Sequence, residues 1–167
     1  RRTISSATAA ARLTPKRPEA SFFNCHGVPP STILAAPSHW GPTMDLRLPE
    51  AQASGFADVA GVRIAWRSFG QAESTVLVIP TWNFVDSRVS ASVVADLSRS
   101  FRVVTFDPRG AGHSDRPATG YRHEDHLSDA IAVTQAAGLG RTSVIAGSAG
   151  ANSAAQLAAR RPDLVER

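Results

Sequence analysis

The chain has 167 residues, of which 43% are hydrophobic, a size and composition typical of one globular domain. No apolar run approaches the roughly 18 residues that a membrane-spanning helix needs, so we expect no membrane partner and a cytoplasmic protein. The single cysteine, Cys25, excludes an internal disulfide, and no Cys/His spacing indicates a zinc site. We therefore expect neither a metal nor another cofactor.

The positive charge of the chain is distributed unevenly. The formal net charge is +4, and the whole excess lies in residues 1–44, because residues 45–167 carry 13 arginines and 13 carboxylates. Phosphate binding depends on cations that cluster on a folded face. Since the part of the chain with a folding pattern has no net positive charge, nucleic acid is not an expected partner.

Residues 1–43 are rich in Ser, Ala, Pro and Arg without hydrophobic periodicity, so they are predicted to be disordered. Met44, the only methionine, stands where the composition changes. One hypothesis is that the native protein starts at Met44 and that the preceding residues are translated upstream sequence. The alternatives are a native disordered tail and an organellar targeting peptide, although Pro15 and Pro18 would break the amphipathic helix of such a peptide. The predicted organisation is this extension followed by a domain over residues 44–167.

Strand and helix patterns alternate from Gly55 onward. An apolar alternation predicts an antiparallel hairpin, and the continuous apolar runs after it predict strands that are buried on both faces. The expected strands are Phe56–Ala60, Val62–Phe69, Thr75–Ile79, Arg102–Phe106 and Ser143–Ala146. The helices expected from apolar residues at helical spacing are Arg88–Ser98, Glu124–Ala137 and Asn152–Arg161. This order indicates an α/β fold with a mainly parallel sheet and flanking helices.

The strand Ser143–Ala146 runs into a turn of small residues that carries Ser148. A nucleophile elbow is a sharp strand-to-helix turn that requires small residues two positions to either side of its serine. Ala146 and Gly150 meet that requirement. Ser153 fits the same pattern but lies within a predicted helix, so Ser148 is the candidate nucleophile. The alternative is a serine that is merely tolerated in a glycine-rich turn.

The loop after the strand Arg102–Phe106 carries the most specific motif, Asp107-Pro108-Arg109-Gly110-Ala111-Gly112-His113-Ser114-Asp115. Together with the turn at Ser148 and the opening hairpin, it resembles the N-terminal half of the α/β-hydrolase family, over residues 61–167. The resemblance implies an incomplete α/β-hydrolase fold that contains the first five strands. It also implies a serine-nucleophile hydrolase that acts on an ester or similar carbonyl of a small-molecule substrate.

The glycines and charged residues of this loop are expected to shape it. Gly110 and Gly112 are expected to adopt positive φ angles in consecutive turns. The residues expected to brace the loop through charge-assisted hydrogen bonds are Asp107, Arg109 and Asp115. His113 is interpreted as solvent-facing, because the resemblance implies a general base much later in the chain. His123 and His126, near the start of a predicted helix, are also interpreted as surface residues.

The end of the strand Thr75–Ile79 departs from the family's pattern. Pro80-Thr81 stands where the resemblance implies a His-Gly turn that contributes a backbone N–H group to the oxyanion hole. The resemblance assigns that N–H group to Trp82, and a second one to Ala149, the residue after the nucleophile. Alternatively, Trp82 is a pocket-wall or packing aromatic, and the two roles are compatible.

The resemblance also implies a chain order of nucleophile, acid and histidine. The nineteen residues after Ser148 contain no histidine, so the chain is interpreted as truncated before its acid and base, and this fragment alone is expected to be inactive. The strand Ser143–Ala146 is then expected to have an unpaired far edge. Two alternatives remain: a non-catalytic hydrolase-like binding or regulatory module, and a dinucleotide-binding α/β protein in which Gly147 and Gly150 belong to the phosphate-binding turn.

Overall fold

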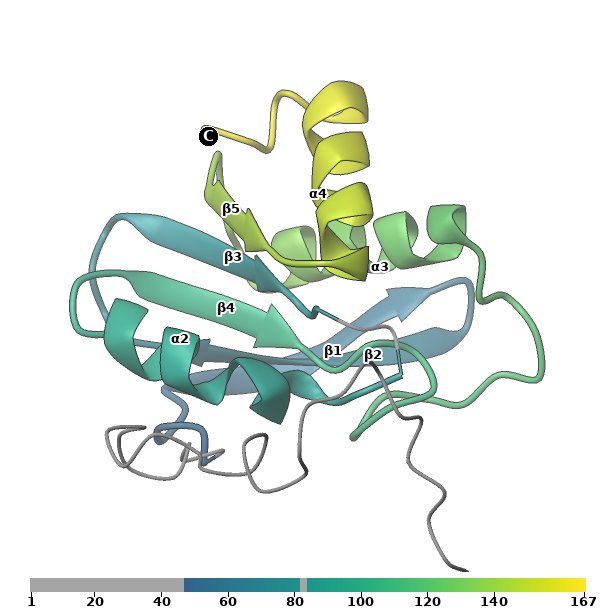
Figure 1. Ribbon diagram of the computed structural model, residues 1–167, viewed down its shortest axis with the longest axis horizontal. Coiled ribbons are helices and arrows are strands. Elements are labelled where there is room, and N and C mark those ends of the chain that lie inside the picture. The colour runs from purple at the N-terminus through teal and green to yellow at the C-terminus, as the bar shows by residue number, and fades with distance from the viewer. Residues whose placement is uncertain (1–46, 82–83) are drawn as a thin grey trace, which may run out of the picture. The chain divides into compact units, whose positions relative to one another are not determined.

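A five-stranded mixed sheet forms the centre of the computed structural model, which describes residues 47–81 and 84–167 (Figure 1). Its strands are β1 (Ala53–Val59), β2 (Val62–Phe69), β3 (Thr75–Ile79), β4 (Arg102–Phe106) and β5 (Ser143–Ala146). Its helices are the 3₁₀ helix η1 (Ser87–Ser90), α2 (Ala91–Leu97), α3 (His123–Ala136) and α4 (Ala149–Arg160). The strands lie in the order β1-β2-β4-β3-β5, which confirms the predicted α/β fold class. The disorder predicted for residues 1–43 concerns residues outside the described part of the chain.

β1 and β2 form the antiparallel hairpin that the alternating pattern predicts. The two residues of its turn, Ala60 and Gly61, have positive φ angles of 52° and 84°. Two-residue turns of this kind match the right-handed twist of the strands that they connect. β2 then pairs antiparallel with β4, whereas β3 pairs in parallel with both β4 and β5. The three parallel strands therefore end at the same edge of the sheet.

Helices cover both faces of the sheet, with α2 on one face and α3 and α4 on the other (Figure 1). Alternate side chains of β3 enter two separate cores. Val76 packs in a cluster with Val94 of α2, whereas Leu77 packs in a larger cluster with Leu127 of α3 and Leu157 of α4. Burial of one such side chain stabilises a fold by about 1.5–3 kcal/mol. This burial on both faces explains why the sequence of β3 is a continuous apolar run.

β5 is an edge strand of the described sheet, and the last residues of the chain lie against its outer side. The N–H groups of Thr142 and Val144 donate to the carbonyl oxygens of Leu164 and Arg167, at 2.9 and 2.8 Å. The expectation of an unpaired far edge is therefore wrong at the start of β5, because the segment after α4 returns to pair there. Further along the strand, Ile145 is 40% exposed.

Strand boundaries agree with the prediction more closely than helix boundaries do. Except for β1, the strands have the predicted bounds. α4 begins at Ala149 rather than at Asn152, because the helix starts directly at the turn, and the predicted helix Arg88–Ser98 is divided into η1 and α2. No helix within the described ranges is long and apolar enough to cross a bilayer.

Candidate active site

Three loops follow the parallel strands at the edge of the sheet where these strands end. They come after β3, β4 and β5, and they begin at Pro80, Asp107 and Gly147. The first loop is joined to the start of α4, directly after the third loop, by a backbone hydrogen bond of 3.3 Å from the N–H group of Gly150 to the carbonyl oxygen of Thr81. In open α/β sheets this edge is where ligands bind. The candidate site therefore has to be built from these loops.

Ser148 occupies the turn between β5 and α4 in a backbone conformation that few side chains adopt. Its φ and ψ are 48° and −125°, and Ala60 is the other non-glycine residue with a positive φ in the described part of the chain. Such a conformation costs on the order of 1–3 kcal/mol and persists only where the surrounding structure enforces it. Ser148 is exposed, and its side chain makes no capping hydrogen bond to α4. A strained, exposed serine at a strand-to-helix turn is the geometry that a nucleophile elbow requires.

Gly150 lies in the first turn of α4, packed against the end of β3. It is buried, and a Cβ atom on this residue would collide with the carbonyl oxygen of Pro80. At Gly147, by contrast, a Cβ atom would lie 3.7 Å from Thr81 Oγ1, which is an ordinary contact. The requirement for a small residue two positions after Ser148 therefore arises from the loop that follows β3.

The backbone N–H group of Ala149 points out of the start of α4 without a helical partner. The first N–H groups of any helix lack an acceptor within it, and no residue that the structure describes accepts a hydrogen bond from this one. The helix dipole adds partial positive charge at the same end. These properties suit the predicted oxyanion-hole role of Ala149. The second predicted donor, Trp82, lies outside the described residues.

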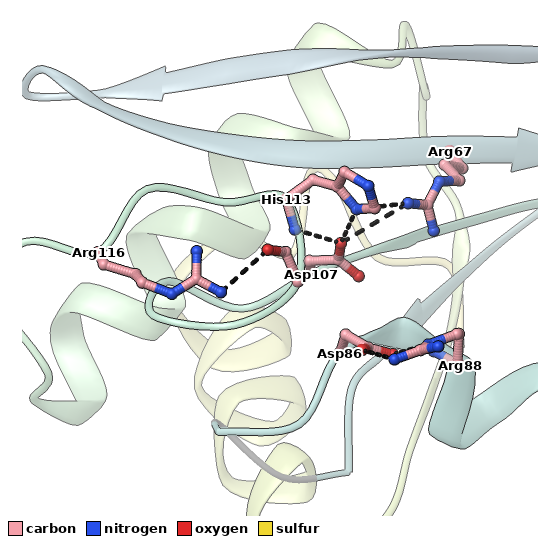
Figure 2. Close-up of a pocket in the computed structure, with 7 residues that line it drawn as sticks. Arg67, Asp86, Arg88, Asp107, His113 and Arg116 are labelled. Atoms are coloured by element: carbon pink, nitrogen blue, oxygen red, sulfur yellow. Dashed lines mark hydrogen bonds and ion pairs between the residues drawn. The ribbon is translucent and has the colours of Figure 1, made fainter.

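Asp107, the first residue after β4, is buried, and it accepts hydrogen bonds from η1 and from its own loop. Figure 2 shows its contact with His113. Its Oδ1 atom accepts from the N–H and hydroxyl groups of Ser87, at 2.8 and 2.7 Å, and its Oδ2 atom accepts from the N–H group of His113 at 2.9 Å. Burial raises the pKa of this carboxyl, but the hydrogen bonds from His113 and Ser87 outweigh burial and hold the pKa below its ordinary value. Asp107 is therefore ionised, and Gly112, which has the predicted positive φ of 50°, leaves room for its carboxylate.

His113 contacts Asp107 without belonging to a serine triad. Its side chain is 72% exposed, as predicted, and its Nδ1 atom lies 3.2 Å from Asp107 Oδ2 and 2.9 Å from Arg67 Nη2. The adjacent hydroxyl group, of Ser114, is buried and donates to the carbonyl oxygen of Asp107. No serine in the described ranges forms a hydrogen bond with the imidazole, so His113 is not positioned to activate one.

Ion pairs anchor the loop after β4, as its charged residues predict. Arg109 forms a buried, bidentate pair with Asp129 of α3, with 2.8 Å between Nε and Oδ2. Asp115 binds Arg63 of β2 through both carboxylate oxygens, at 3.0 and 3.2 Å. Gly110 has the predicted positive φ, 82°. The loop is thus fixed to a helix on one side and to a strand on the other.

His126 is buried in α3, so its interpretation as a surface residue is wrong. It is 6% exposed, and its Nδ1 atom lies 4.0 Å from Asp129 Oδ2. It shares the buried side of the helix with Ala130 and Val133, which follow it at helical spacing. Burial lowers the pKa of the imidazole and favours its neutral form. His123, the first residue of α3, is exposed as predicted.

A pocket of about 420 Å³ opens beside Asp107, between η1, β2 and the loop after β4 (Figure 2). Its charged lining residues and its histidine are Arg67, Asp86, Arg88, Asp107, His113 and Arg116. Sequence reasoning missed this pocket, because its arginines lie on three segments that no local spacing connects. Ser148 is not among the lining residues.

A family model described as alpha/beta hydrolase fold matches residues 75–167, more than half of the chain. The chain belongs to the alpha/beta hydrolase family. The matched region of this alpha/beta hydrolase runs from β3 through the turn at Ser148 to the end of the chain. Membership of the family argues against the dinucleotide-binding alternative, which rested on Gly147 and Gly150.

Among the relatives of the chain are proteins named as a hydrolase and as an enol-lactonase. Over 80 residues, 48% of its length, the chain is 34% identical to a 2-(acetamidomethylene)succinate hydrolase of Mesorhizobium japonicum. It is also similar to the crystal structure of an enol-lactonase from Burkholderia xenovorans LB400, with 30% identity, a TM-score of 0.62 and 68% of this chain covered. A crystal structure of E-2-(acetamidomethylene)succinate hydrolase gives 27% identity, a TM-score of 0.58 and the same coverage, 68%.

The chain spans less than half of each of these relatives. It covers 29% of the curated hydrolase and 44% and 41% of the two solved chains. The activity and the substrate of the whole protein are therefore matters for a proposal.

Proposed function

We propose that this member of the alpha/beta hydrolase family cleaves an ester or similar carbonyl bond of a small-molecule substrate, with Ser148 as its nucleophile. The observation that carries the proposal is the strained backbone of Ser148 at the exposed turn after β5. A positive φ is uncommon for serine, and strain of this kind is concentrated at functional sites. The relatives named as an enol-lactonase and a 2-(acetamidomethylene)succinate hydrolase support hydrolysis as the reaction.

In the proposed reaction, Ser148 Oγ attacks the carbonyl carbon of the substrate, and the carbonyl oxygen becomes an oxyanion. The N–H group of Ala149 stabilises this oxyanion, and the N–H group of Trp82 is the proposed second donor. Loss of one such donor typically costs about 2.7–4 kcal/mol of transition-state stabilisation. Collapse of the intermediate expels the leaving group and forms an acyl-enzyme, which water then hydrolyses to the free acid and the serine.

Ser148 needs a general base, and the histidines of the described ranges do not suit that role. His113 is held by Asp107 and Arg67, and His126 is buried in α3. We therefore assign the catalytic acid and histidine to a part of the full-length protein that follows Arg167, as the family's chain order implies.

The test is Ser148→Ala in the full-length gene product, assayed on short activated esters. Because the serine forms the covalent intermediate, we expect kcat/KM to fall by about 10⁴-fold or more. Ser153→Ala is the matched control, since Ser153 fits the same small-residue pattern but is buried within α4. It should keep nearly the wild-type rate.

Mass spectrometry of the rapidly quenched reaction adds a second measurement, because an acyl group should be found on the peptide that contains Ser148. Equal losses of activity in the two variants would contradict the assignment of the nucleophile. A folded wild-type protein that cleaves none of the esters would favour the non-catalytic binding or regulatory module.

A further inference from the structure

We propose that the pocket between η1, β2 and the loop after β4 binds an anionic group of a small molecule, either a carboxylate or a phosphate. Three guanidinium groups line it, those of Arg67, Arg88 and Arg116. Since Ser148 does not line this pocket, the proposal is independent of the catalytic function proposed above.

The two carboxylates of the pocket are already bound within the protein. Both oxygens of Asp107 accept hydrogen bonds, from Ser87 on one side and from His113 on the other. Asp86 is held by Arg88, whose Nε and Nη2 atoms lie 2.9 and 2.7 Å from its two oxygens. Asp107 Oδ2 also lies 3.8 Å from Arg67 Nη2, so the two carboxylates compensate the charges of Arg67 and Arg88.

Arg116 is the cation that lacks an acidic partner. Its Nη1 and Nη2 atoms donate to the carbonyl oxygens of Ser114 and Gly112, at 3.4 and 3.1 Å. No carboxylate in the described ranges pairs with it. Carbonyl oxygens orient a guanidinium group, but they leave its charge uncompensated, and most of its five N–H donors stay available. An anionic ligand would supply the missing countercharge.

Arg67 reaches the same pocket from β2 and is held in place there (Figure 2). Its Nη2 atom lies 2.9 Å from His113 Nδ1 and 3.8 Å from Asp107 Oδ2, and its Nη1 atom lies 3.3 Å from Ser87 Oγ. The side chain is 27% exposed, so it remains accessible to a ligand. A guanidinium group that is already positioned loses little conformational entropy when it binds an anion.

The size and charge of the pocket select the class of ligand. A volume of about 420 Å³ accommodates a small organic molecule as well as a bare ion. Three guanidinium groups against two carboxylates leave an excess of positive charge, which disfavours a cationic ligand. Guanidinium groups bind carboxylate and phosphate oxygens through paired N–H donors, so the two anions share this recognition chemistry.

Titration calorimetry of the full chain with inorganic phosphate and with malonate, at constant ionic strength, tests the proposal. We expect saturable binding of at least one anion, weakened about tenfold or more by Arg116→Gln, because a charge-assisted contact is lost. Arg88→Gln should weaken binding as well, and it leaves the loop that holds Arg116 unchanged. Tighter binding of phosphate would indicate that the natural ligand carries a phosphate group. Tighter binding of malonate would indicate that it carries a carboxylate.

Arg99→Gln is the matched control, because it makes the same change of charge outside the pocket, at a side chain that is 78% exposed. It should leave the Kd of either anion at the wild-type value. Ser148→Ala should also retain anion binding, so that failure of the catalytic proposal and failure of this one are distinguishable. Absence of saturable binding, or equal weakening by Arg99→Gln and Arg116→Gln, would overturn the proposal.

Discussion

At the scale of single residues, Ser148 and Gly150 together allow the tight turn between β5 and α4. Ser148 has the strained φ, and Gly150 provides the space that lets α4 approach the loop after β3. The N–H group of Gly150 lies 3.0 Å from the carbonyl oxygen of Gly147 and 3.3 Å from that of Thr81. These contacts fix the start of α4, and the backbone of Ser148 cannot relax without breaking them.

Gly150→Ala is therefore expected to destabilise the protein. The new Cβ atom would meet the carbonyl oxygen of Pro80, which belongs to the backbone and cannot rotate away. Overpacking of this kind costs about 1–3 kcal/mol, which outweighs the roughly 1 kcal/mol that alanine gains over glycine in a helix. Urea unfolding of the full chain measures the change in the free energy of unfolding.

Gly147→Ala is the control for this prediction, since its Cβ atom would make only an ordinary contact with Thr81. We expect its free energy of unfolding to stay close to the wild-type value. If the two variants were equally stable, crowding at Pro80 would not explain the glycine at position 150.

At the scale of elements, the buried histidine of α3 is expected to make stability depend on pH. Burial lowers the pKa of His126 in the folded protein from its ordinary value of 6.5. Below that pH the unfolded chain binds a proton that the folded protein does not, so the free energy of unfolding falls as the pH falls. We expect this loss to begin near pH 6.5 and to continue down to the folded-state pKa.

Urea unfolding of wild type and His126→Gln between pH 8 and pH 5 measures this effect, and the variant should lose less stability over that interval. His123→Gln is the control, because His123 lies exposed at the start of the same helix. Identical pH profiles for wild type and His126→Gln would show that the buried imidazole does not cause the dependence.

The sequence predicts the strands well because their signal is local. A short run such as residues 76–79, which are apolar throughout, stand after Thr75 and end at Pro80, fits a strand buried between two layers of helices. Helix starts are harder to predict, because α4 begins at Ala149 within a run of small residues that has no hydrophobic face to mark it. The burial of His126 follows from which side of α3 meets the sheet, and that depends on tertiary packing.

The candidate site divides in the same way. The strand-to-helix turn at Ser148 can be predicted, because the strand, the small residues and the helix that define it are neighbours in the sequence. The pocket cannot, because Arg67, Arg88 and Arg116 come together only after β2, η1 and the loop after β4 have assembled. Individually, each of these arginines resembles an ordinary surface residue.

At the scale of the whole molecule, deletion of residues 1–43 is expected to change neither the fold nor the melting temperature. These residues show no apolar periodicity, so they are expected to form no hydrophobic face that could pack against the domain. Thermal melting followed by circular dichroism compares the shortened and full chains. A fall of several degrees would contradict both the predicted disorder and the hypothesis that the protein starts at Met44.

A longer deletion, of residues 1–52, provides the contrast. It removes Leu48 and Ala51, which pack against the core cluster on the α2 side of the sheet. We expect this variant to melt at a lower temperature than the chain that lacks only residues 1–43.

The contacts of Asp107 have a consequence for how cooperatively the protein folds. Its carboxylate is satisfied by Ser87 of η1 and by His113 of its own loop, with Arg67 of β2 close by. An unpaired carboxylate is costly to bury, so β4 cannot enter the core with Asp107 in place until these other segments are also there. Partly assembled states lack the hydrogen bonds from Ser87 and the nearby charge of Arg67, whereas the complete fold satisfies both carboxylate oxygens. A single buried acid thereby favours an all-or-none folding transition.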